Sequence, residues 1–88
     1  MDFRWNEWNI EHVQKHGVFP EEAEDAVRLA RLPYPEARED GKRLAIGPGV
    51  GGRLLQVVYL VGDDDCVYVI HARPLTDVEK HRYRRRMR

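Results

Sequence analysis

Apolar residues in the first third of the chain recur at helical spacing in two separate segments. A helix is predicted from Asn6, a favourable N-cap, to about His16. A second helix is predicted to begin at Pro20 and to end before Pro33. Residues 33–41 contain prolines and acidic side chains and are expected to form a connector. The buried face of the second helix is expected to consist of Ala23, Ala26, Val27 and Ala30.

After Gly41 the helical spacing gives way to β-prone runs separated by turns. The last of these runs is followed by Thr76 and Glu79, which form the sequence pattern of a capping box and predict a final helix. We therefore expect an α+β fold, with two N-terminal helices and a C-terminal helix around a small antiparallel β-sheet, in one domain spanning residues 1–88. The first two helices should cover one face of the sheet. Strands are predicted at residues 43–47, 53–61 and 66–72, and a short strand-like segment opens the chain at 3–5.

Length and composition narrow the class of protein. A chain of 88 residues that is 42% hydrophobic and 34% charged fits one globular domain with a core. The longest largely apolar run, residues 54–61, is too short to cross a bilayer, and no secretory signal is recognised. Cys66 is the only cysteine, so no internal disulfide can form. A cytoplasmic location without membrane association is therefore expected.

The charges are distributed unevenly, although 15 basic and 15 acidic residues cancel. Residues 20–41 carry a net charge of −4, and residues 71–88 carry a net charge of +5. A chain polarised in this way can hold a polyanion at its basic end. The alternative is a solvated C-terminal helix whose basic tail binds nothing.

Two motifs resemble ligand sites but lack the context that such sites need. The glycine-rich segment 47–52 is followed by a strand, whereas a phosphate-binding loop needs a helix N-terminus there, so we interpret it as a turn. His12 and His16 are four residues apart on the first predicted helix, but no third metal ligand occurs at a fixed spacing. No metal and no cofactor are expected, and a metal-binding protein that uses these two histidines remains an alternative.

Arginine and histidine residues gather on the last two predicted strands. Strict alternation places Arg53 on one face of its strand, and places His71 and Arg73 together on one face of the next. If these faces coincide, two guanidiniums can bind one phosphate while an imidazole transfers a proton, which suits phosphodiester cleavage without metal. Exposed arginines at strand ends contribute little to stability, so folding should not depend on them. The alternative is that Arg73 only ends its strand and pairs with Asp77 or Glu79.

Several segments, taken in order, resemble a family of small toxins. Near the N-terminus these are WNEWNIEH at residues 5–12, KHGV at 15–18 and PEEA at 20–23. Further on, GR at 52–53 leads an apolar strand, and VIHAR at 69–73 is followed by Thr76, Glu79 and Tyr83. This ordered set, which spans nearly the whole chain, resembles the BrnT-type toxins. Asn6 stands where these toxins usually have aspartate, and His71 stands where they usually have serine or threonine.

The resemblance implies a RelE-like fold and a metal-independent endoribonuclease, the toxin of a type II toxin–antitoxin module. Such a toxin inhibits translation by cleaving RNA, in some cases on the ribosome, and its partner is a cognate DNA-binding antitoxin. The candidate site residues carried over by position are Lys15, His16, Arg53 and Arg73, and His71 is added on chemical grounds. The alternative is a catalytically weak or inactive module on the same scaffold that binds RNA or protein.

Overall fold

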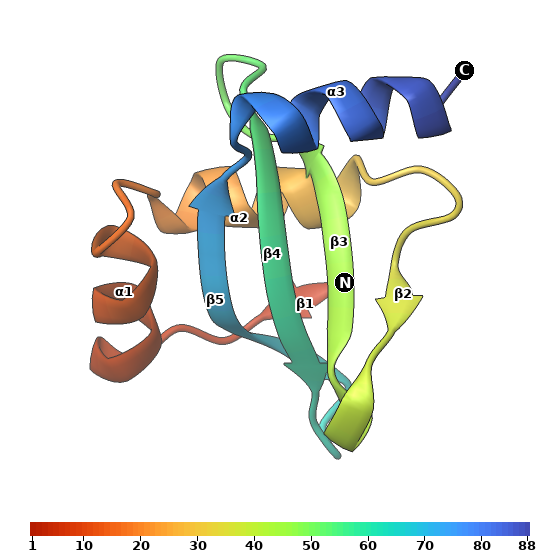
Figure 1. The fold of residues 1–88 in the computed structure, drawn as a ribbon. Helices are drawn as coiled ribbons and strands as arrows, with labels where there is room; N and C mark the ends of the chain where they lie inside the picture. The colour runs from red at the N-terminus through yellow and green to blue at the C-terminus, as the bar shows by residue number, and fades with distance from the viewer.

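Capping residues determine where the first two helices of the computed structural model begin; the model describes residues 1–88 (Figure 1). Helix α1 spans Glu7–Gln14. The Asn6 side chain accepts a hydrogen bond from the Asn9 N–H, and the Asn9 side chain accepts one from the Asn6 N–H. Aspartate would make the same first contact, so asparagine at this position preserves the cap. Helix α2 spans Pro20–Arg28, with Pro20 in its first turn as predicted.

A five-stranded sheet forms the centre of the molecule, with the order β1-β5-β4-β3-β2. The antiparallel meander predicted for the last three strands is confirmed, and β4 is central. The expectation of a purely antiparallel sheet is wrong, because β1 pairs with β5 in parallel. A second difference from the prediction is strand β2, which lies within the segment predicted as a connector and pairs with β3. The strands are β1 (Asp2–Phe3), β2 (Glu36–Ala37), β3 (Arg43–Pro48), β4 (Leu54–Val61) and β5 (Cys66–Pro74).

The hydrophobic core lies between the sheet and the first two helices, on what we call the α2 face of the sheet. Helix α2 packs on β3 and β4, while α1 packs against β5 at the side of the sheet (Figure 1). The predicted helical face is largely confirmed, since Ala23, Ala26 and Val27 are buried and Ala30 is partly buried. Gly47 of β3 faces α2 so closely that a Cβ atom there would clash with the backbone carbonyl of Ala26.

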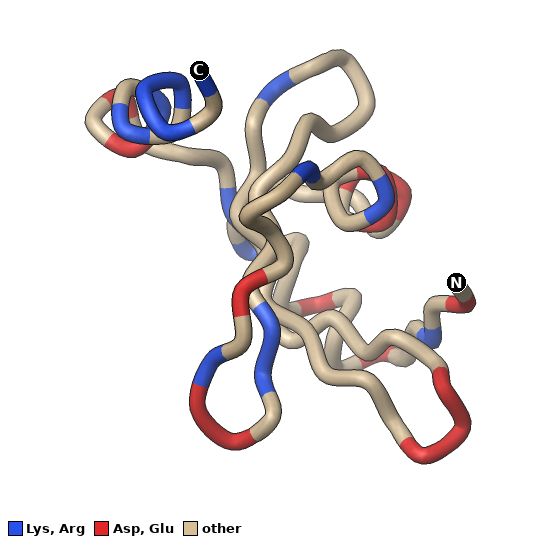
Figure 2. The backbone as a smooth tube through the Cα atoms, turned by 90° about the vertical axis from the view of Figure 1, so that its right-hand side faces the viewer, with Lys and Arg blue, Asp and Glu red and all other residues tan.

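Helix α3, Asp77–Arg86, lies on the opposite side of the sheet, which we call the α3 face (Figures 1 and 2). Its capping box is confirmed, because the Thr76 hydroxyl accepts from the Glu79 N–H and the Glu79 carboxylate accepts from the Thr76 N–H. None of its residues is fully buried. The arginines of α3 and the acidic residues of α2 therefore lie on opposite faces (Figure 2). None of the three helices combines the length and the apolar character that spanning a membrane requires.

A β-bulge in β5 changes which side chains share a face. Tyr59 pairs with Val69, but the preceding residue of β4, Val58, pairs with His71, so Ile70 is an extra residue. After the bulge, Arg73 pairs with Gln56. His71 and Arg73 share a face of β5 as predicted, but the bulge places that face opposite the one on which Val67 and Val69 lie, so strict alternation along β5 is wrong. The register places His71 and Arg73 on the α3 face, away from the core.

Candidate functional site

Arg53 lies just before β4 and turns its guanidinium toward α2. Its Nε donates to Glu22 Oε2 at 2.6 Å, and its Nη2 donates to Glu22 Oε1 at 2.7 Å and to the Gly17 carbonyl at 2.7 Å. The Glu22 side chain is only 8% exposed. Hydrogen bonds from Arg53 hold the pKa of Glu22 below its ordinary value. Arg53 thus joins the turn after α1 to the first turn of α2.

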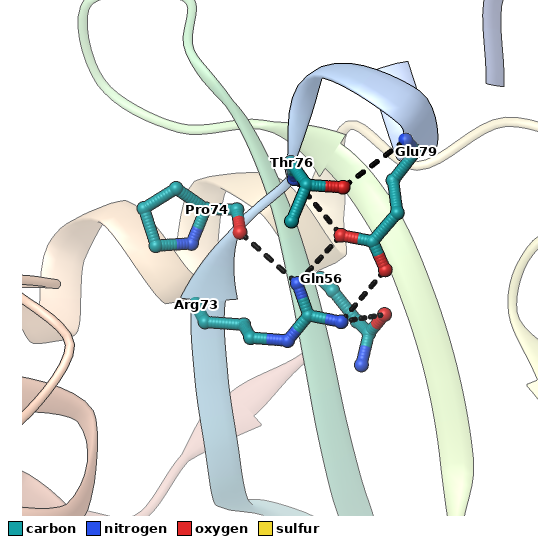
Figure 3. A network of polar contacts seen from close by, with 5 residues as sticks. All are labelled: Gln56, Arg73, Pro74, Thr76 and Glu79. Carbon is teal, nitrogen blue, oxygen red and sulfur yellow. Dashed lines mark hydrogen bonds and ion pairs between the residues drawn. The ribbon is translucent and has the colours of Figure 1, made fainter. Parts of the chain in front are cut away.

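Arg73, near the end of β5, is held on the α3 face by a second carboxylate (Figure 3). Its Nη1 and Nη2 each donate to one oxygen of Glu79 at 2.7 Å, and Nη2 also lies 3.3 Å from Gln56 Oε1. These hydrogen bonds lower the pKa of Glu79 to about 2. The alternative in which Arg73 pairs with Glu79 is therefore confirmed.

The structure does not bring the two candidate arginines together. Arg53 contacts Glu22 on the α2 face, whereas Arg73 contacts Gln56 and Glu79 on the α3 face. The hypothesis that both guanidiniums reach one phosphate depended on strict alternation in β5, which the bulge interrupts. In this arrangement the two guanidiniums face opposite sides of the sheet, and Arg53 holds the turn that contains Gly17 against α2.

The structure does bring together two of the candidate histidines, at the junction of α1 and β5. The rings of His16 and His71 meet edge to face with centroids 5.1 Å apart. Burial lowers the pKa of His71 first of all, and the nearby charges of His16, Arg73 and His12 lower it further. His71 is therefore a neutral imidazole at neutral pH, able to accept a proton. Lys15 and His16 are exposed in the turn beside it.

His12, the second histidine of the possible metal-binding pair, makes its contacts within helix α1. Its ring stacks on Trp8 with centroids 3.8 Å apart, and its Nδ1 lies 2.7 Å from the Trp8 carbonyl oxygen. The structure contains no group of three or more histidine, cysteine or acidic side chains that could hold a metal ion. The geometry thus gives no support to a metal site formed by His12 and His16.

A cleft of about 210 Å³ opens between α3 and the α3 face of the sheet, and we call it the α3 cleft. Two tyrosines, Tyr34 and Tyr83, line it with their rings stacked, their centroids 6.1 Å apart and their planes inclined by 27°. Gln56 and Glu79, which hold Arg73, also line the cleft. The cleft is therefore continuous with the surroundings of Arg73.

Sequence reasoning missed most residues of the α3 cleft. Tyr34 falls in the segment interpreted as a connector, yet it is only 5% exposed. The sequence feature that could have identified Tyr34 is its position as an aromatic residue between two prolines, in a segment otherwise dominated by charged residues. Glu36 and Arg38 gave no such signal, because their role depends on β2 pairing with β3.

Comparison of the chain with models of known protein families, with curated proteins and with solved structures found no match. The function must therefore be argued from the residues themselves.

Proposed function

We propose that this protein is a metal-independent endoribonuclease of the BrnT type, with a RelE-like fold and the role of toxin in a type II toxin–antitoxin module. The observation that carries the proposal is the pair formed by His16 and His71, with Arg73 two residues from His71 along β5. Two imidazoles can serve as general base and general acid when RNA is cleaved by its own 2′-hydroxyl, and a guanidinium can stabilise the charge on the phosphate. The order of the sequence motifs supports the family.

In the proposed reaction, the neutral His71 takes the proton of the ribose 2′-hydroxyl. The 2′-oxygen then attacks the adjacent phosphorus, and the bond from phosphorus to the 5′-oxygen breaks. His16 gives a proton to the departing 5′-oxygen. The products are a 2′,3′-cyclic phosphate and a 5′-hydroxyl, and Arg73 with Lys15 stabilises the charge that develops on the phosphoryl oxygens.

One specific observation favours the alternative, a binding module without catalysis. Arg53 and Arg73 each donate two hydrogen bonds to a carboxylate, so neither guanidinium has a pair of unoccupied N–H groups for a phosphate. In the enzyme, the RNA phosphate must displace Glu79 from Arg73. In the alternative, Glu79 keeps Arg73, and the exposed arginines of α3 bind RNA or protein.

The proposed partners follow from the charge of α3. Its last turn carries Arg84, Arg85 and Arg86, and the tail ends at Arg88. This surface is proposed to bind either RNA phosphates or the cognate antitoxin, in the cytoplasm and, for RNA, on the ribosome. Whether the RNA target is ribosome-bound is decided by assaying cleavage with and without ribosomes.

The test is RNA cleavage by purified wild type and by His16→Ala, His71→Ala and Arg73→Ala. Each variant should lose on the order of 10²-fold or more in rate, as expected for a general acid, a general base or a charge-stabilising donor. His81→Ala is the matched control, because His81 is exposed on α3. Variants that cleave as fast as His81→Ala would refute the site, and a wild type that is inert even with ribosomes would establish the binding module.

A further inference from the structure

The α3 cleft has the dimensions and the walls of a site for one flat ring. Its volume of about 210 Å³ lies below the ~300–1,000 Å³ that is typical of pockets for whole small molecules. The ring of Tyr83 is partly exposed toward it, stacked on the buried ring of Tyr34. Single-stranded RNA is read by stacking unpaired bases on aromatic side chains. The aromatic wall therefore fits a nucleobase.

Glu36 provides the cleft with a carboxylate whose two oxygens each form an ion pair with an arginine. Its Oε1 is buried and receives no hydrogen bond. Arg86 Nη1 lies 2.7 Å from this oxygen, so the contact is an ion pair whose direction does not make a hydrogen bond. An N–H group that takes the place of Arg86 at this oxygen gains the hydrogen-bond geometry that the ion pair lacks.

Arginine side chains surround this acceptor. Arg38 lies 3.4 Å from the other Glu36 oxygen, and Arg82 and Arg86 line the cleft from α3. The Arg86 side chain is 51% exposed and covers Glu36 Oε1, so it can turn outward to a phosphate and uncover the carboxylate. A nucleotide offers both partners at once, a phosphate for the arginines and a base edge for Glu36.

The four RNA bases differ in what they present to a carboxylate. Guanine has two adjacent N–H donors on its Watson–Crick edge, which match the two oxygens of a carboxylate. Adenine and cytosine place a ring-nitrogen acceptor next to their amino group, and uracil flanks its single N–H with two carbonyls. A carboxylate therefore favours guanine and repels the acceptors of the other three.

We propose that the α3 cleft is a guanine subsite, in which the base stacks on Tyr83, its Watson–Crick edge donates to Glu36, and Arg82 and Arg86 bind the phosphate. This inference rests on the proposed function, since the ligand is part of an RNA strand. Gln56 and Glu79 line both this cleft and the surroundings of Arg73. Cleavage therefore occurs next to a guanosine.

The experiment is an NMR chemical-shift titration of the full chain with GMP, AMP, CMP and UMP. GMP should bind about 10-fold more tightly than the other three, in the range of a bidentate contact. Glu36→Gln should abolish this preference, whereas Glu21→Gln, a change at an exposed position of α2, should keep it. Tyr83→Leu should weaken the binding of all four nucleotides to the same extent. Tyr83→Phe should not weaken it, because the phenyl ring still stacks on the base.

Equal affinities for the four nucleotides in wild type, or an unchanged preference in Glu36→Gln, would overturn the subsite. Folding of each variant is checked by circular dichroism, and the Tyr83→Phe and Tyr83→Leu pair gives a second measure of base stacking. Because the titration does not require catalysis, a protein that prefers GMP but cleaves no RNA would refute the enzyme and keep the subsite. A protein that cleaves RNA without preferring GMP would refute the subsite alone.

Discussion

Replacing Arg53 by alanine should destabilise the protein strongly. The substitution removes two short hydrogen bonds from the carboxylate of Glu22 and one from the Gly17 carbonyl. The Glu22 side chain is 8% exposed, so its charge would stay buried with only the Phe19 N–H, at 3.4 Å, as a donor. This expectation corrects the view from the sequence that an arginine at the end of a strand matters little for folding.

The size of the expected destabilisation follows from how deeply Arg53 and Glu22 are buried. Removing one member of a buried ion pair costs about 3–5 kcal/mol, and the 43% exposure of Arg53 lets water replace part of the lost contact. We therefore expect a loss of about 2–3 kcal/mol in the free energy of unfolding. For a domain of this size, that corresponds to a melting temperature lower by roughly 10–20 °C.

The assay is thermal unfolding followed by circular dichroism, with Arg28→Ala as the matched control. Arg28 pairs with Glu24 on the surface of α2 at 3.1 Å, and its loss should cost less than about 1 kcal/mol. If Arg53→Ala lowers the melting temperature no more than Arg28→Ala does, the reasoning is refuted.

The dependence on pH provides an independent check. Because Arg53 depresses the pKa of Glu22 in the folded state, the stabilisation is present above the ordinary carboxyl pKa and is lost as the pH falls through the depressed value. In Arg53→Ala, protonation instead relieves a buried charge. The difference in stability between wild type and variant should therefore shrink toward acidic pH, and a difference that grows on acidification would contradict the proposed pairing.

Three further predictions concern other contacts. Gly47→Ala should lower the free energy of unfolding by at least about 1–3 kcal/mol, measured by urea denaturation, because its Cβ clashes with the Ala26 carbonyl. Glu79→Gln should strengthen RNA binding in a filter assay, because it weakens the pair that occupies Arg73. His71 should titrate below 6.5 by NMR, so the stability that its neutral form provides is full above pH 6.5 and declines as the pH falls through the lowered pKa.

Each of these predictions has a matched control. Gly51→Ala adds a Cβ in open space, although its φ of 87° strains any other residue, so it should cost less than Gly47→Ala. Asp77→Asn removes a carboxylate that lies in the same turn of α3 but does not contact Arg73, so RNA binding at low salt should rise less than in Glu79→Gln. His81 serves as the exposed histidine. Equal effects in variant and control, or a His71 pKa that is not below 6.5, would show the corresponding contact to be misassigned.

Local signals in the sequence were sufficient to predict the three helices and the three strands of the meander. Asn6, Pro20 and Thr76 each begin a helix as predicted, because capping depends on residues within one turn. Residues 54–61 are largely apolar on both faces of the strand, which is typical of a central strand, and β4 is central in the sheet. The sequence did not predict β2 or the parallel pairing of β1, because two-residue strands carry no periodicity and the partner of β1 lies far along the chain.

The candidate site was harder to predict, since it depends on register. One extra residue, Ile70, reverses the face on which Arg73 lies, and nothing in the sequence marks a bulge there. The partner of Arg53 is 31 residues away in α2, so alternation along β4 could not identify it. The pairing of Arg73 with Glu79 was foreseeable because only five residues separate them.

The parallel pairing of β1 with β5 has a consequence for the order in which the protein folds. Asp2 and Phe3 pair with Cys66 and Val67, which lie far from them along the chain. Contacts of such large sequence separation form slowly. The meander of β3, β4 and β5, whose neighbouring strands are joined by short turns, should therefore form before β1 pairs with β5.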